Sequence, residues 1–108
     1  MTLYGLKTCD TCRKVLKALE AGGYDVRFHD VRAAPLSADE IAHFHAAFGS
    51  KLLNRASATW RALSEAERAG DEKALLAAHP TLMKRPLIAH GDRLHLGWGP
   101  EVQAALLS

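Results

Sequence analysis

Two cysteines lie three positions apart near the amino terminus, in the segment Cys9-Asp10-Thr11-Cys12, and the sequence contains no others. Two thiols at this spacing indicate either redox chemistry or half of a metal site. In redox chemistry it is the thiolate that attacks, so one of the two sulfurs has to lie where an anion is favoured. The pair therefore predicts a thiol–disulfide exchange site, provided that a neighbouring element stabilises the thiolate.

A helix that begins next to Cys9 would supply that element. Unpaired N–H groups and the positive end of the helix dipole favour an anion at a helix start, and Lys7 and Arg13 add positive charge on either side. Cys12 would follow one turn later, with roughly 5–6 Å between the two Cβ atoms. We therefore predict that Cys9 attacks the substrate and that Cys12 or glutathione resolves the mixed disulfide.

Two other interpretations of the cysteine pair stay open. A free cysteine is often buried as a small apolar side chain, which is the alternative role for Cys12. A zinc site needs four nitrogen or sulfur ligands, and histidines would have to complete it. The six histidines show no ligand spacing, since His43 and His45, two apart, fall on different faces of a helix. We therefore expect no bound metal.

The size and composition of the chain limit its class. Its 108 residues suggest one domain, large enough to bury an apolar core without metal or disulfide cross-links. The net charge of +2 is too small to predict nucleic-acid binding. No segment approaches the ~20 apolar residues that cross a bilayer, and the start has no basic segment followed by a long apolar run. We expect a cytoplasmic protein with reduced thiols and with no membrane or direct nucleic-acid partner.

The first third of the chain predicts two strands joined by a helix. Thr2–Gly5 is short, mostly apolar and closed by glycine. Asp10 or Thr11 is predicted to cap a helix that ends at Gly22-Gly23, and Tyr24–Val31 alternates as a second strand. Two strands joined by a helix within about thirty residues predict a parallel pair.

The rest of the chain divides into a helical part and a second part with strands. Helices are predicted over about residues 37–79, beginning with a capping box between Ser37 and Glu40. Two strands joined by a tight turn and a final helix follow, over Leu87–His90, Arg93–Gly97 and Glu101–Leu107. The predicted fold is α/β, a single domain over residues 1–108 in the order βαβ, helical insertion, ββα.

Several segments together resemble the arsenate reductase-related family, often called the ArsC/Spx family, over nearly the whole chain. The matching segments agree in residue types and in spacing: Leu3-Tyr4-Gly5, Cys9-Asp10-Thr11-Cys12-Arg13-Lys14, Leu52-Leu53-Asn54-Arg55, Thr59-Trp60-Arg61-Ala62-Leu63, Lys84-Arg85-Pro86-Leu87-Ile88 and Leu96-Gly97-Trp98. The resemblance implies a thioredoxin-like fold with an extra helical insertion. This agrees with the order of elements predicted from the residues.

The resemblance also implies roles for residues outside the dithiol. Cys9 matches the reactive cysteine of the family, and Pro86 matches the cis-proline that lies beside it. Arg55 and Arg85 match two of the arginines that surround this cysteine and bind the oxyanion in arsenate reductases. Trp60, in contrast, is expected to be a packing residue.

Three functions follow from the resemblance. The segment Thr59-Trp60-Arg61 favours the branch of thiol reductases, with glutathione as co-substrate, a small thiol or oxyanion as substrate and glutaredoxin as partner. A Spx-type redox-sensing regulator that binds the RNA polymerase α subunit is the first alternative, because it carries a dithiol at the same place. Arsenate reduction is the second. A third arginine of arsenate reductases has no match, since Leu96 or Gly97 holds its position, and an arsenate dianion needs several charge-assisted hydrogen bonds.

Overall fold

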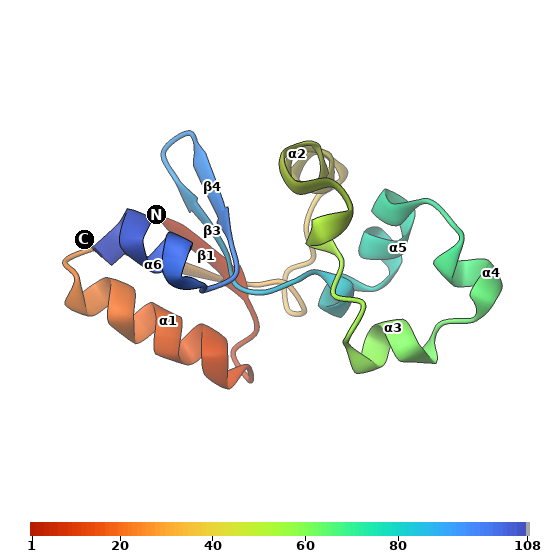
Figure 1. Cartoon of the computed structure of the whole chain (residues 1–108), viewed down its shortest axis with the longest axis horizontal. Helices are drawn as coiled ribbons and strands as arrows, with labels where there is room; N and C mark the ends of the chain where they lie inside the picture. Colours follow the sequence, from red (N-terminus) through yellow and green to blue (C-terminus); the bar gives the residue numbers. More distant parts are fainter. Residues whose placement is uncertain (108) are drawn as a thin grey trace. The chain divides into compact units, whose positions relative to one another are not determined.

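The structure, a computed structural model, describes residues 1–107, and the chain forms two compact units (Figure 1). Unit 1 contains Met1–Val31 and the chain from Arg85 onward, and unit 2 contains Arg32–Lys84. Unit 1 holds the strands and two helices, and unit 2 is helical. The predicted α/β class and order of elements are therefore confirmed. The single-domain organisation, with its insertion at about residues 37–79, stays a prediction.

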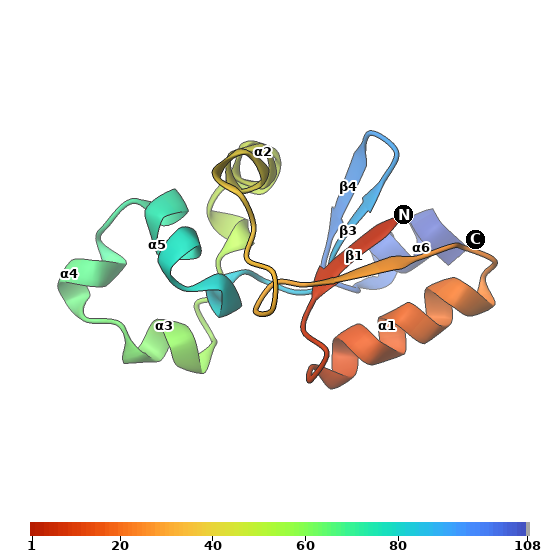
Figure 2. The ribbon, with the colours of Figure 1, turned by 180° about the vertical axis from the view of Figure 1, so that it is seen from behind.

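Unit 1 is built on a four-stranded sheet, seen from two sides in Figures 1 and 2. Its strands are β1 Thr2–Gly5, β2 Arg27–Asp30, β3 Leu87–His90 and β4 Arg93–Leu96. Their order is β2-β1-β3-β4, with β1 parallel to β2, β1 antiparallel to β3, and β3 antiparallel to β4. The predicted parallel pair and the predicted hairpin are both confirmed. The segment that contains the dithiol follows directly after β1, which is a central strand of the sheet.

The second strand, β2, is shorter than the predicted strand over Tyr24–Val31. The Tyr24 N–H donates to the carbonyl oxygen of Leu19 at 3.1 Å, so it completes the end of the preceding helix. Pairing with the neighbouring strand begins only where the Arg27 N–H donates to the carbonyl oxygen of Met1 at 2.9 Å. The alternating pattern thus indicates the correct region for a strand. The first residues of the predicted strand, however, form the end of the preceding helix and not part of β2.

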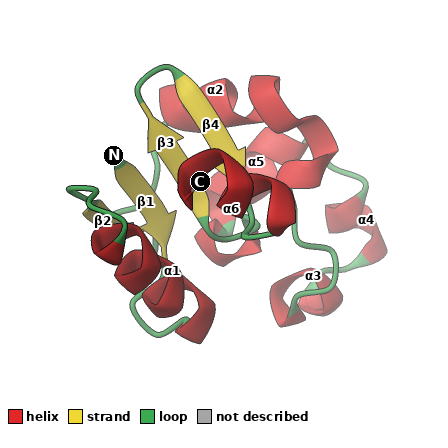
Figure 3. Cartoon of the chain, turned by 60° about the vertical axis from the view of Figure 1, so that its left-hand side comes forward, coloured by secondary structure: helices red, strands yellow, loops and turns green. Residues whose placement is uncertain are grey.

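Two helices of unit 1, α1 Asp10–Ala21 and α6 Pro100–Leu107, pack on the sheet (Figure 3). Their apolar side chains meet those of β1 and β3 in one core, formed by Leu3, Cys12, Val15, Leu19, Ile88 and Leu106. Each of these residues is at most 5% exposed, and full burial of an aliphatic side chain contributes about 1.5–3 kcal/mol. The core therefore fixes α1, and with it the cysteines at its start, against the sheet.

Unit 2 consists of short helices. They are α2 Ala38–Phe48, η1 Gly49–Leu52, α3 Ala58–Ala62, α4 Glu65–Arg68, α5 Glu72–Ala78 and η2 Pro80–Leu82, where η marks a 3₁₀ helix. The predicted capping box between Ser37 and Glu40 is present, with hydrogen bonds of 3.0 and 3.1 Å. Ser64 and Glu67 form a second one, and the Asp71 carboxylate caps α5. Among residues 1–107, no helix is long and apolar enough to cross a membrane.

The middle of unit 2 is joined to its last residues through the backbone. Leu53 and Met83 form an antiparallel bridge, and backbone hydrogen bonds of 2.9 and 2.8 Å flank it. The bridge holds the main chain just before Arg55 in place, so the backbone position of this arginine is well defined.

Candidate active site

Cys9 lies at the point where the chain from β1 turns into α1. Cys9 itself is the N-cap of α1, with extended backbone angles (φ −85°, ψ 117°), so the prediction that Asp10 or Thr11 caps this helix is wrong. The Cys9 carbonyl accepts a hydrogen bond from the Arg13 N–H at 3.1 Å, and the Cys9 N–H donates to the carbonyl oxygen of Leu6 at 3.0 Å. A sulfur therefore occupies the place where a capping oxygen is usual.

These surroundings lower the pKa of Cys9 below its ordinary value of 9.0. The largest single influence, partial burial, raises the pKa, but several groups that favour the anion outweigh it. The N–H groups of Cys12 and Thr11 and the Cys12 thiol stabilise the sulfur by hydrogen bonding, and the charge of Arg85 attracts it. Cys9 is thus a thiol with increased thiolate character, as a nucleophile requires.

Cys12 has the opposite properties. Its side chain is fully buried in the core of unit 1, and this burial, reinforced by the neighbouring Cys9 sulfur, raises the pKa of Cys12 to about 11. A backbone hydrogen bond from Leu6 and the charge of Arg85 offset only part of the rise. The two thiols interact directly, with one favoured as the anion and the other as the acid.

Gly5, the last residue of β1, provides the space for the Cys12 thiol. A Cβ atom at position 5 would lie 2.6 Å from the Cys12 Sγ and 3.2 Å from the Cys12 Cβ. The shorter distance is far below the roughly 3.5–4.0 Å of a favourable non-bonded contact. Gly5 therefore belongs to the site, although the sequence analysis names it only as a strand end and as part of a segment that matches the family.

Arg85 and Pro86 lie directly before β3. The peptide bond between them is cis, the isomer that the family resemblance implies for Pro86. The Pro86 side chain is fully buried, and its carbonyl oxygen accepts a hydrogen bond from the Gly97 N–H at 2.8 Å. Arg85 is partly buried, and its charge lowers the pKa of both cysteines. Arg85 therefore supplies a cation to the dithiol from within unit 1.

Lys7 and Arg13 are the other two cations predicted near Cys9, and both are exposed. The Lys7 backbone N–H donates to a carboxylate oxygen of Asp30 at 2.9 Å, which anchors the turn before the dithiol. Arg13 forms an ion pair with Asp10 on the outer side of α1. Asp10 is the first residue of α1 itself, one position after the N-cap.

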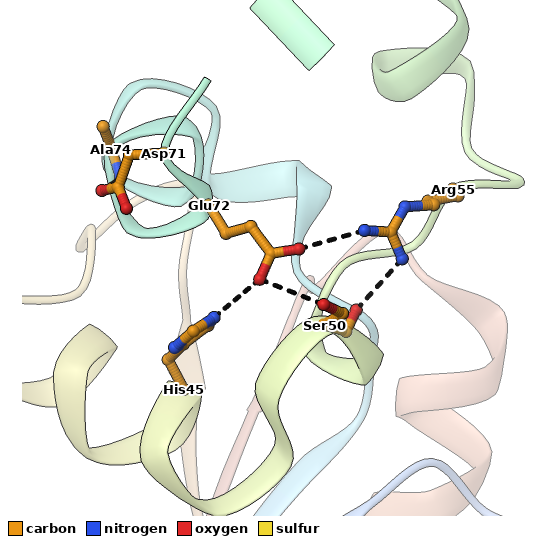
Figure 4. A network of polar contacts seen from close by, with 6 residues as sticks. All are labelled: His45, Ser50, Arg55, Asp71, Glu72 and Ala74. Carbon is orange, nitrogen blue, oxygen red and sulfur yellow. Dashed lines mark hydrogen bonds and ion pairs between the residues drawn. The ribbon is translucent and has the colours of Figure 1, made fainter. Parts of the chain in front are cut away.

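Arg55 lies in a network of polar contacts in unit 2 (Figure 4). Its Nη2 donates to Oε2 of Glu72 at 3.0 Å, and its Nη1 to the carbonyl oxygen of Ser50 at 3.4 Å. Oε1 of Glu72 accepts a hydrogen bond from the Ser50 hydroxyl at 3.2 Å and lies 2.8 Å from Nε2 of His45. The Arg55 guanidinium carbon stands 5.3 Å from the centre of the Trp60 ring, within cation–π range.

The sequence pattern identifies Arg55 but not the residues that hold it. Glu72 is 17 positions from Arg55 and 27 from His45, and no local spacing links residues so far apart. Trp60, predicted to be a packing residue, contacts two guanidinium groups. The second is that of Arg68, whose guanidinium carbon lies 5.6 Å from the centre of the Trp60 ring. The contacts of Arg55 described here lie within unit 2, and its role at the dithiol stays a prediction.

Metal ligation is one of the two other interpretations of the cysteine pair. Among residues 1–107, no three or more His, Cys, Asp or Glu side chains form a group that could hold a metal ion. A four-coordinate zinc site needs four such ligands, and the absence of a bound metal stays a prediction.

Comparison with known proteins identifies the relatives of this chain. The sequence profile described as the ArsC family matches residues 4–106. An uncharacterized protein of Haemophilus influenzae is 36% identical over 111 residues, which cover 97% of each chain. The global transcriptional regulator Spx of Streptococcus pyogenes serotype M1 is 28% identical over 114 residues, which cover 100% of this chain and 85% of Spx.

A solved structure, that of the YFFB (PA3664) protein, has the same fold. It superposes with a TM-score of 0.88 at 34% identity, and the match covers 99% of this chain and 98% of the other. Together with the sheet order β2-β1-β3-β4, this superposition confirms the thioredoxin-like fold with a helical insertion.

Proposed function

Because the chain belongs to the ArsC family, we propose that it is a thiol–disulfide oxidoreductase in which Cys9 is the nucleophile and Cys12 the resolving thiol. One observation carries this proposal. The pKa values of the two thiols depart from the ordinary value in opposite directions, downward for Cys9 and upward for Cys12. The thiol with more thiolate attacks first, and the difference between the two thiols gives the exchange its direction.

The proposed cycle consists of two exchange steps. In the first, the Cys9 thiolate attacks one sulfur of a substrate disulfide RS–SR′, which forms a Cys9–SR bond and releases R′S⁻. In the second, Cys12 loses its proton and attacks the Cys9 sulfur, which releases RS⁻ and leaves a Cys9–Cys12 disulfide. Two electrons have then passed to the substrate. Two molecules of glutathione, or one glutaredoxin dithiol, reduce the pair again and become oxidised to a disulfide.

The burial of Cys12 gives glutathione a second role as a competing resolving thiol. With a pKa of about 11, Cys12 supplies little thiolate at neutral pH. Glutathione can reach the mixed disulfide at the half-buried Cys9 from solvent and attack the sulfur of the R group, which releases the Cys9 thiolate and forms a GS–SR disulfide. Where R is itself glutathione, this product is glutathione disulfide. In this route Cys9 works alone, and Cys12 serves to stabilise the Cys9 thiolate by hydrogen bonding.

Arginines supply the proposed recognition of an anionic substrate. Glutathione carries two carboxylates, and a guanidinium group binds a carboxylate through paired charge-assisted hydrogen bonds. The effect of the Arg85 charge on Cys9 supports this role for Arg85, and the family resemblance assigns the same role to Arg55. Lys7 and Arg13, both exposed, add positive charge for long-range attraction of the anion.

The proposal is tested by alkylating the reduced protein over a range of pH and assigning the modified cysteine by mass spectrometry. We expect Cys9 to react with a midpoint below 9.0 and Cys12 only at much higher pH. We also expect reduction of hydroxyethyl disulfide with glutathione to disappear in Cys9→Ser and to persist in part in Cys12→Ser. A Cys9 midpoint at or above the ordinary value would sink the proposal.

The similarity to Spx supports a second candidate function, a redox-sensing regulator that binds the RNA polymerase α subunit. Such a protein uses the same Cys9–Cys12 disulfide as a signal instead of a step in turnover. Binding of the oxidised and the reduced chain to the isolated α subunit separates the two candidates. Binding that depends on the state of the pair, without disulfide reductase turnover, would favour the regulator.

Arsenate reduction is the remaining alternative. An arsenate dianion beside a thiolate requires several charge-assisted hydrogen bonds, and the position of the third arginine of arsenate reductases holds Leu96 or Gly97 here. We expect little turnover of arsenate with glutathione and glutaredoxin. Turnover comparable to that of hydroxyethyl disulfide would make arsenate the preferred substrate instead.

A further inference from the structure

Three different elements of unit 2 contact the Arg55 side chain, and Figure 4 shows the contacts with Glu72 and Ser50. The Glu72 carboxylate comes from the start of α5, the Ser50 carbonyl from η1 and the Trp60 ring from α3. The side chain is nevertheless 49% exposed. An exposed arginine normally samples many rotamers and loses this freedom when it binds a ligand. Arg55 has lost much of that freedom before any ligand arrives.

The Arg55 guanidinium still has N–H groups that can donate to a ligand. A guanidinium has five N–H groups, and Arg55 uses one on Nη2 for Glu72 and one on Nη1 for Ser50. Within residues 1–107, the other three have no hydrogen-bond partner. Since they lie on a half-exposed, oriented plane, they suit the paired hydrogen bonds that a carboxylate or another oxyanion accepts.

Glu72 is the residue on which this arrangement depends. Its carboxylate accepts hydrogen bonds from Arg55 and Ser50 and contacts His45, so it links α2, η1 and α5. The hydrogen bond with His45, followed by that from Ser50 and the charge of Arg55, lowers the pKa of Glu72. The carboxylate is therefore ionised at neutral pH and able to orient the guanidinium.

From these contacts we propose that Glu72 is a positioning residue, which orients Arg55 so that its remaining N–H groups are presented to the carboxylate of a substrate thiol such as glutathione. The inference rests on the proposed function in one respect, the anionic substrate. It adds a basis for specificity, because a neutral disulfide gains nothing from an oriented guanidinium. Glu72 itself touches Arg55 and not the substrate.

A simpler role for Glu72 predicts the opposite result. If the carboxylate only neutralised Arg55, its removal would increase the local positive charge and strengthen anion binding. If it positions Arg55, its removal frees the side chain, and binding weakens. The sign of the change therefore separates the two roles. The size of the change separates the two roles as well. Glu72→Gln keeps an acceptor oxygen for Arg55 and should weaken binding less than Glu72→Ala, which keeps none.

The test measures binding of S-methylglutathione, which retains both carboxylates and has no free thiol, to the whole chain by titration calorimetry. We expect Glu72→Ala to weaken binding about 5- to 10-fold and Glu72→Gln about 2- to 5-fold, as loss of part of a charge-assisted contact would. Glu65→Gln removes the same charge from an exposed position in unit 2 and should leave binding within about twofold. In an Arg55→Lys background, Glu72→Ala should have little further effect.

Unchanged or tighter binding by the Glu72 variants overturns the inference, and so does a wild-type chain that does not bind S-methylglutathione. Thermal unfolding of each variant shows whether a weaker binder is still folded. The proposed function is measured separately on the same proteins, by alkylation of Cys9 and by a single turnover of the reduced protein with hydroxyethyl disulfide, which is neutral, in the absence of glutathione. Normal Cys9 chemistry with unaltered binding means that only the positioning role fails. Altered binding with an unreactive Cys9 means that only the proposed reductase fails.

Discussion

The dithiol of unit 1 and the network around Arg55 in unit 2 both stabilise charged groups, but with different parts of the chain. At the dithiol, main-chain N–H groups of the first turn of α1 act on Cys9, and Gly5 makes room for Cys12. In the network most contacts are made by side chains, and the partners of Glu72 lie 17 to 27 positions away.

This difference determines how each site responds to change. The dithiol includes a fully buried thiol, so it is sensitive to volume and to the cost of burying a charge. The network lies on side chains that are 26–49% exposed, so it is sensitive to charge and to salt. If this difference holds, substitutions at the dithiol should have larger effects than substitutions in the network.

Substitution of Cys9 should have a far larger effect on turnover than substitution of Arg55. Cys9→Ser removes the nucleophile, and we expect disulfide reduction to fall by at least about 1,000-fold, as for other catalytic nucleophiles. Arg55→Lys keeps the charge and loses the planar fork, and we expect about a 10-fold loss with a glutathione mixed disulfide, mainly through KM. Steady-state kinetics with this substrate measure both. Equal losses would mean that the network takes part in the chemistry itself.

The same difference decides what the sequence can predict. The start of α1 beside Cys9, the capping box of Ser37 and Glu40 and the hairpin of β3 and β4 depend on residues a few positions apart, and all three are confirmed. Local propensity also has limits. Asp10 looks like a better cap than Cys9, but the helix begins at Asp10, so Cys9 takes the N-cap position.

Features that depend on packing between distant segments could not be predicted. Tyr24 continues an alternating strand pattern, yet its N–H closes α1 and its hydroxyl donates to the carbonyl oxygen of Leu106 at 2.5 Å. Glu72 is an ordinary acidic residue at a helix start until the fold brings it to Arg55. The space that Gly5 provides is likewise visible only when Cys12 is packed against it.

Stability at alkaline pH should depend on Cys12. In an unfolded chain the thiol ionises near 9.0, whereas in the folded chain its pKa is about 11, so the folded state holds the proton more tightly. This stabilisation is fully present below pH 9 and is lost as the pH rises to about 11, with a maximum loss of about 2–3 kcal/mol. The lowered pKa of Cys9 has the opposite effect on the free energy of unfolding. It stabilises the folded chain as the pH rises, at lower pH than the effect of Cys12.

Urea unfolding of the reduced protein between about pH 8 and 11 measures this dependence. The informative quantity is the difference between the wild type and Cys12→Ala, in which the contributions common to both proteins cancel. We expect the two curves to converge as the pH rises, because the variant has no buried thiol to ionise. Parallel curves would show that Cys12 is not held as a buried acid.

Gly5→Ala should destabilise the protein through Cys12 in particular. A methyl group at position 5 would lie 2.6 Å from the Cys12 Sγ, and relief of such overpacking costs about 1–3 kcal/mol. In a Cys12→Ala background the sulfur is gone, and we expect the same change to cost at least about 1 kcal/mol less. A double-mutant cycle by urea unfolding gives the coupling. An additive cycle would remove Gly5 from the site.

Glu72→Gln should have the smallest effect on stability. An ion pair between partly exposed side chains contributes about 0–1 kcal/mol, so we expect the free energy of unfolding to fall by less than about 1 kcal/mol. The loss should shrink further in about 0.5 M NaCl, where exposed charges are screened within a few ångströms. Cys12→Ala, which changes a buried site, should show no such dependence on salt. The measurement is urea unfolding of both variants at low and high salt. If Glu72→Gln instead lost several kcal/mol at both salt concentrations, Glu72 would be a structural residue of unit 2, and the contrast with the buried dithiol would not hold.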